Sequence, residues 1–106
     1  MLAAFDLVIV SAGGGKFLAL GDLIAYARQN PGKVELGTPG VGTTQHLAAE
    51  WFKRAAQLEL QVLPFKSTPD LITRIRSGRV DAGLDILGPL LAQIQSKALR
   101  PLAVTG

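Results

Sequence analysis

The sequence predicts a single three-layer α/β domain with about five mostly parallel strands and helices on both faces of the sheet. Short apolar runs alternate with segments of helical periodicity, and Gly or Pro separates one segment from the next. Consecutive parallel strands require a helical crossover, so this alternation favours a mostly parallel sheet. With 106 residues, 48% of them hydrophobic, the chain can build one core and not two. We therefore expect residues 1–106 to form one domain.

The first part of the chain contains two expected strands and a helix. Residues 5–10 are apolar and rich in β-forming side chains, and the glycines within residues 11–15 then predict a mobile turn. Residues 20–29 carry apolar side chains at helical spacing, and an Asn-Pro-Gly run ends this helix. Residues 34–36 predict a brief strand that leads into a glycine-rich segment.

The longest expected helix covers residues 43–57. Its apolar residues share one stripe, which we expect to be buried: Leu47, Ala48, Trp51, Phe52 and Ala55. Polar and charged residues, among them Glu50 and Lys53, lie on the opposite side.

The second half of the chain continues the alternation. Strands are expected at residues 58–63, 80–85 and 102–104. Thr68-Pro69 opens a helix, with Thr68 supplying a capping hydroxyl and the proline in the first helical position. Ser77-Gly78 closes that helix, and Gly88-Pro89 starts the last one.

The composition excludes several classes of protein. There is no cysteine and a single histidine, so we expect no disulfide, no thiol chemistry and no metal site. The formal net charge of +3 mildly favours anionic ligands and is too small to indicate nucleic acid as a partner. The apolar runs fall far short of the roughly 20 residues that a membrane span requires. Residues 1–4 lack the features of a signal peptide, so a secreted form would need a leader that this sequence does not contain.

Familiar cofactor and hydrolase motifs are not satisfied. A Walker A loop ending at Gly15-Lys16 would need glycine at Val10 and a hydroxyl side chain at Phe17. A dinucleotide fingerprint would need its third glycine at Gln45 or Leu18. The Gly-x-Ser-x-Gly elbow of a serine hydrolase does not occur. We therefore expect no cofactor.

The segment from Gly37 to His46 carries the strongest chemical signal, because it joins an expected strand to the longest helix. The first N–H groups of a helix lack intrahelical partners, and together with the helix dipole they favour a carboxylate or phosphate. The candidate ligand-binding residues here are Thr38, Pro39, Gly40, Val41, Gly42, Thr43, Thr44 and His46. A tight, capped connection without a ligand is the alternative, and for His46 packing and ligand contact are equally open.

Two other strand ends supply candidate residues. Phe65 and Lys66 follow the third expected strand and Asp85 ends the fourth, where an α/β sheet presents its ligand-binding loops. Lys66 would attract an anion. Asp85 would accept a hydrogen bond from a ligand amine or hydroxyl, or would hold a loop by accepting from backbone N–H groups. Taken alone, each is also explained as a solvated or capping residue.

Several runs together resemble one family. They are Asn-Pro-Gly-Lys at residues 30–33, Gly-Thr-Pro-Gly-Val-Gly-Thr-Thr-Gln-His-Leu at 37–47, Val-Asp and Leu-Asp at 80–81 and 84–85, and Leu-Arg-Pro-Leu-Ala-Val-Thr at 99–105. In this order they resemble the Bug-type periplasmic solute receptors of tripartite tricarboxylate transporters, over nearly the whole chain. The chain departs from the family at residues 65–67, where Phe-Lys-Ser replaces the usual Tyr-Lys-Gly.

The resemblance implies the second lobe of a receptor whose two α/β lobes, as in a type II periplasmic binding protein, close on a small carboxylate. The loop from Thr38 to Thr44 would grip one ligand carboxylate through backbone N–H groups and hydroxyls, and Asp85 would lie beside it. Such a receptor would be periplasmic, and only the full-length form would meet a membrane transporter. Without the first lobe, binding of di- or tricarboxylates should be weak or undetectable.

Two other hypotheses remain open from the residues. The unit would act as an interaction module if its former lobe-facing surface pairs with a second copy to form a homodimer. It would act as an enzyme only if Thr43, His46 and Asp85 lie within hydrogen-bond reach of one another. We favour the binding role and expect no catalysis.

Overall fold

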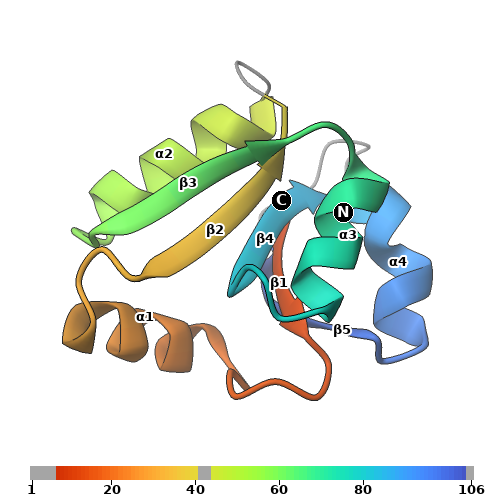
Figure 1. Cartoon of the computed structure of the whole chain (residues 1–106), viewed down its shortest axis with the longest axis horizontal. Helices are drawn as coiled ribbons and strands as arrows, with labels where there is room; N and C mark the ends of the chain where they lie inside the picture. Colours follow the sequence, from red (N-terminus) through yellow and green to blue (C-terminus); the bar gives the residue numbers. More distant parts are fainter. Residues whose placement is uncertain (1–6, 41–43, 105–106) are drawn as a thin grey trace.

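A computed structural model describes residues 7–40 and 44–104, which form one five-stranded sheet covered by helices (Figure 1). The strand order is β3-β2-β4-β1-β5. The strands are β1 (Leu7–Ala12), β2 (Val34–Pro39), β3 (Leu60–Phe65), β4 (Ala82–Ile86) and β5 (Leu99–Val104). The helices are α1 (Leu20–Gln29), α2 (Thr44–Ala55), α3 (Thr68–Arg76) and α4 (Leu87–Gln95). The expected α/β class, with strands and helices alternating in one domain, is confirmed.

The sheet is mixed, because β1 runs against the other strands. β2 pairs in parallel with both β3 and β4, whereas β1 pairs antiparallel with both β4 and β5. The strands other than β1 therefore share one direction. Their carboxyl ends meet at one edge of the sheet, and the chain enters β1 at that same edge.

Two helices cover each face of the sheet. α1 and α2 pack over a core cluster that includes Leu23, Ala49 and, from the sheet, Ile9 and Leu36. α3 and α4 pack on the other face over a cluster that contains Leu71 and Leu90. Successive strand residues alternate between the two clusters, as the pleat requires. The inner strands β1, β2 and β4 are thus largely buried on both sides, whereas the edge strand β3 is partly exposed.

The buried face of α2 differs from the expected one. Ala49 is fully buried, and Ala48 and Phe52 are half-buried against the sheet. Leu47 and Trp51, expected in the core, are 63% and 70% exposed. The reason is a rotation of the helix: its small alanines approach the sheet, and the larger residues of the same broad apolar stripe turn outward. Ala55 is also exposed, contrary to expectation.

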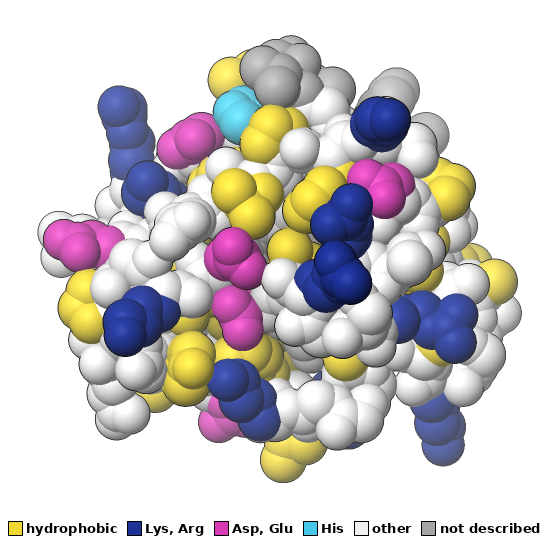
Figure 2. Space-filling model, in the orientation of Figure 1, with side chains coloured by type: hydrophobic (Ala, Val, Ile, Leu, Met, Phe, Trp, Pro, Cys, Tyr) yellow, Lys and Arg dark blue, Asp and Glu magenta, His cyan; other side chains and the backbone are white. Residues whose placement is uncertain are grey.

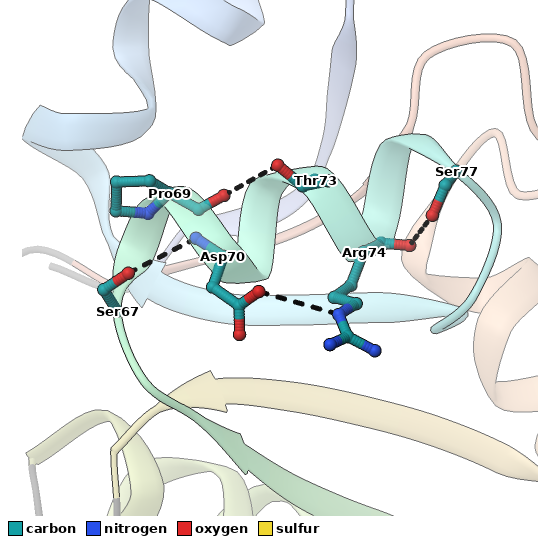
Figure 3. Close-up of polar contacts among 6 residues, drawn as sticks. All are labelled: Ser67, Pro69, Asp70, Thr73, Arg74 and Ser77. Atoms are coloured by element: carbon teal, nitrogen blue, oxygen red, sulfur yellow. Dashed lines mark hydrogen bonds and ion pairs between the residues drawn. The ribbon is translucent and has the colours of Figure 1, made fainter.

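The helix α3 begins one residue earlier than its sequence suggests (Figure 3). Ser67, in an extended conformation, is the N-cap, and its side chain accepts a hydrogen bond of 3.4 Å from the backbone N–H of Asp70. Thr68 is therefore the first helical residue and not the cap. Its hydroxyl donates a hydrogen bond to Asp85 instead. One turn further on, Asp70 pairs with Arg74 at 3.6 Å.

The charged side chains do not gather into a single basic patch on the face shown in Figure 2, where Lys and Arg alternate with Asp and Glu. Among the described helices, none has the length and apolar character needed to span a membrane.

Candidate functional site

Parallel strands that lead directly into helices define one edge of the sheet. β2 ends at Pro39 and α2 begins at Thr44, β3 ends at Phe65 and α3 begins at Thr68, and β4 ends at Ile86 where α4 begins at Leu87. The N-termini of α2, α3 and α4 therefore lie at the edge where these strands end (Figure 1). Helix N-termini carry unpaired N–H groups and a partial positive charge, so this edge suits an anion.

Both described ends of the chain lie at this edge as well. Val8, near the start of β1, pairs with Val104 of β5 on one side and with Asp85 of β4 on the other. β1 therefore begins, and β5 ends, at the edge that carries the helix N-termini.

Thr38 is the polar residue buried most completely at this edge. It lies near the end of β2 and has no exposed surface. Its Oγ1 has no hydrogen-bond partner among the residues that the structure describes. A buried hydroxyl without a partner is costly, so it marks a place where a donor or acceptor is missing.

The turn after β2 is built around Gly40. Its φ of +91° is a conformation that favours glycine. The N–H of Gly40 donates a hydrogen bond of 2.7 Å to the carbonyl of Phe65, which joins the end of β2 to β3. The Gly40 amide therefore already has a partner within the protein. Pro39 precedes it as the last residue of β2. The other expected amide donors, Val41, Gly42 and Thr43, lie outside the described residues.

The first turn of α2 carries two more candidates. Thr44 is exposed and is the first residue of the helix. The His46 side chain is 19% exposed, and its Nε2 lies 3.9 Å from Oε2 of Glu50 one turn along. The same turn contains Gln45, which was not among the expected site residues and which contacts Asp85.

Phe65 and Lys66, at the end of β3, differ in their burial. Phe65 is half-buried and belongs to the core cluster beneath α3, with the Arg74 guanidinium carbon 5.5 Å from its ring centroid. Lys66 is exposed. The phenylalanine thus packs into the domain, whereas the lysine contributes a positive charge at the rim.

Asp85 is buried and hydrogen-bonded within the domain. Its carboxylate is 1% exposed and accepts hydrogen bonds from Gln45 Nε2 at 3.2 Å, Thr68 Oγ1 at 2.7 Å and the backbone N–H of Ile86 at 2.6 Å. Of the two roles left open by the sequence, these contacts match the holding of neighbouring segments. Within the described ranges, no group of His, Asp and Glu side chains could hold a metal ion.

The fold resembles one lobe of a periplasmic binding protein. The solved structure of the periplasmic binding protein BugD superposes with a TM-score of 0.85 at 25% identity, over 95% of this chain and 34% of the BugD chain. The solved structure of R. palustris Rpa4515 with adipate superposes with a TM-score of 0.89 at 30% identity, over 95% of this chain and 34% of that one.

The family follows from the sequence comparison. The model of the tripartite tricarboxylate transporter family receptor, TctC, matches residues 1–106. A protein of Pseudomonas sp. (strain P51), the UPF0065 protein in the tcbD-tcbE intergenic region, is 30% identical over 105 residues, covering 99% of this chain and 31% of that protein. The chain therefore belongs to the tripartite tricarboxylate transporter receptor family. It spans about a third of the length of these relatives.

Proposed function

We propose that this chain supplies half of a binding site for small di- or tricarboxylates and carries no catalysis. The observation that carries the proposal is the arrangement of strands β2, β3 and β4, each of which ends at one edge and leads into a helix N-terminus there. Such an edge offers amides and a positive field to a ligand carboxylate. The adipate in the related Rpa4515 structure is a ligand of this chemical class.

Thr38 and the turn that follows it form the proposed carboxylate contact. The buried Oγ1 of Thr38 would gain a partner, directly or through an ordered water, when a ligand carboxylate binds at the start of α2. Thr44 would add a second hydroxyl, and Val41, Gly42 and Thr43 would provide amides. Lys66 would attract the anion from the rim.

The lone chain should bind weakly because it encloses one side of the ligand only. A ligand held at an open edge keeps part of its hydration and loses the contacts that a second lobe would add. We expect dissociation constants of about 1 mM or weaker for succinate, citrate, glutamate or nicotinate. Calorimetry or an amide-shift titration measures this, and micromolar binding would contradict the half-site.

Thr38→Val provides a sharper test, because stability and binding should change in opposite directions. Removing a buried hydroxyl that lacks a partner should raise the free energy of unfolding by about 1 kcal/mol. The same change should weaken succinate binding. Urea unfolding followed by circular dichroism and a succinate titration give the two quantities.

Ser11→Ala is the matched control for Thr38→Val. Ser11 is also buried, and its hydroxyl also has no partner among the described residues. It lies near the end of β1, at the edge opposite to the helix N-termini. Ser11→Ala should leave succinate binding unchanged. If Thr38→Val and the unmodified chain bind succinate with equal affinity, Thr38 is not part of the binding site.

A second candidate function is self-association, here through the outer face of α2 and not through the lobe-facing surface expected from the sequence. Leu47 and Trp51 lie one turn apart and are both largely exposed. Trp51 also lines an apolar cavity of about 70 Å³, together with Phe52, Leu7 and Leu84. An exposed apolar face of this kind is a candidate for pairing with a second copy of the chain.

Trp51→Lys tests the self-association. If this face forms a homodimer, light scattering at rising concentration should show a dimer for the unmodified chain and a monomer for Trp51→Lys. Leu18→Lys is the control, since Leu18 is 68% exposed and precedes α1 at another part of the surface. A monomer at every concentration would exclude this function.

Location and partners follow from the receptor role. A full-length receptor with this lobe would act in the periplasm and would deliver its ligand to a membrane transporter. Export of the full-length protein, followed by cell fractionation, would test the location.

A further inference from the structure

We propose that Asp85 is a positioning residue that holds the proposed ligand-binding turn of α2 in place without touching the ligand. This inference rests on the proposed carboxylate-binding function. It assigns to Asp85 a role at the site different from the direct ligand contact that its place at a strand end suggested.

The contacts of Asp85 join helices from opposite faces of the sheet. Gln45, in the first turn of α2, donates to Oδ1, and Thr68, the first residue of α3, donates to Oδ2. α2 and α3 cover different faces, as their separate core clusters show. The N–H of Ile86, which precedes α4, also donates to Oδ1. One carboxylate therefore links the beginnings of α2, α3 and α4.

The charge of Asp85 suits this position. Neither α2 nor α4 has an acidic residue in its first turn, whereas α3 has Asp70. A carboxylate near a helix N-terminus stabilises that helix, and Asp85 supplies this charge from the adjacent strand β4. The charge is buried, so its hydrogen bonds are stronger than those of an exposed carboxylate.

The same contacts make Asp85 a poor ligand group. Both of its oxygens already accept hydrogen bonds, and its exposed fraction is 1%. Because Asp85 is buried, a ligand amine or hydroxyl could reach it only if the residues that cover it moved. The route from Asp85 to the ligand runs instead through Gln45, which is adjacent to Thr44 at the start of α2.

Two substitutions separate positioning from a simple effect of charge. Asp85→Asn removes a negative charge close to the anion edge, and electrostatics alone would then strengthen carboxylate binding. If Asp85 positions Gln45, the opposite is expected. The affinity of Asp85→Asn for a carboxylate should fall about fivefold, because Gln45 loses its charged acceptor. Gln45→Met removes the donor without any change in charge and should cause a similar loss.

The experiment titrates the chain and its variants with succinate and with glutamate, followed by backbone amide shifts, and records each melting temperature. We expect Asp85→Asn and Gln45→Met to weaken both acids by the same factor. The double variant should be no weaker than Asp85→Asn alone, because the two residues act as a unit. Gln95→Met, at the exposed end of α4, is the matched control and should bind like the unmodified chain.

Three results would overturn the inference. Loss of glutamate binding alone would make Asp85 a contact for the ligand ammonium group. A lower melting temperature with unchanged affinity would leave it a purely structural role. Additive losses in the double variant would show that Asp85 does not act through Gln45.

If the unmodified chain binds too weakly to be titrated, as a half-site allows, the amide spectra decide the positioning role separately from the proposed function. Asp85→Asn should shift the first-turn amides of both α2 and α3, whereas Gln45→Met should shift those of α2 only. If Asp85→Asn leaves the α2 amides in place, the positioning role is wrong.

Discussion

Gly13→Ala should lower the free energy of unfolding by about 3 kcal/mol, one of the two largest effects that we expect from a single substitution. A Cβ on Gly13 would lie 1.8 Å from the carbonyl oxygen of Lys97. That atom belongs to the backbone, so it cannot rotate away as a side chain would. The Gly13 N–H also donates to the carbonyl of Ala98 at 2.9 Å, which fixes the turn after β1 against the start of β5.

Gly14→Ala is the control for this prediction. A Cβ on Gly14 would meet no heavy atom within 4 Å, so this variant should unfold at nearly the same urea concentration as the unmodified chain. Equal stability of the Gly13 and Gly14 variants, measured by urea unfolding and circular dichroism, would mean that the turn does not lie against residues 97–98.

Leu71→Ala should also cost about 3 kcal/mol, because it deletes a fully buried side chain at the centre of α3. Leu71 fills the space over two glycines of the sheet: a Cβ on Gly37 would lie 2.6 Å from Leu71 Cδ1, and one on Gly83 would lie 3.2 Å from it. The glycines beneath Leu71 have no side chains that could move into the cavity. Thermal or urea unfolding measures the loss.

Leu91→Ala, on α4, gives the comparison. Leu91 is 43% exposed, so the same deletion removes less buried surface and should cost less than about 1 kcal/mol. If the two leucine variants lost similar stability, α3 would not be packed on the sheet as the structure has it.

The α/β class could be predicted from the sequence because strand-like and helix-like segments alternate along the chain. This alternation favours a sheet with helices packed on its faces. Helix α1, at Leu20–Gln29, begins and ends at the predicted residues, since apolar spacing and the Asn-Pro-Gly run that follows both act locally. Strand β2 is longer than predicted. Its last residues, Gly37 to Pro39, look like a turn in isolation but pair with Leu63 to Phe65 of β3.

The direction of β1 and the rotation of α2 depend on contacts distant in the sequence. β1 is apolar on both faces, so its own sequence does not indicate whether the neighbouring strands run parallel or antiparallel to it. The apolar stripe of α2 is wide enough for two orientations. The close approach of Ala49 to the sheet decides between them and leaves Trp51 exposed.

The candidate site was predictable where the signal is local. The strand-to-helix segment after Thr38 was located from its glycines and hydroxyls, and the structure places Thr38 at the edge where the parallel strands end. The partners of Asp85 were not predictable. Gln45 and Thr68 lie 40 and 17 residues from it in the chain, so only the folded arrangement brings them to one carboxylate.

Titration of the isotope-labelled chain with succinate, with every backbone amide resolved, tests most directly whether an anion binds at the start of α2. We predict millimolar saturation with the largest shifts at residues 38–44. Shifts at the exposed cations Arg76 and Arg79, with none at residues 38–44, would show diffuse attraction to surface charge and contradict the site.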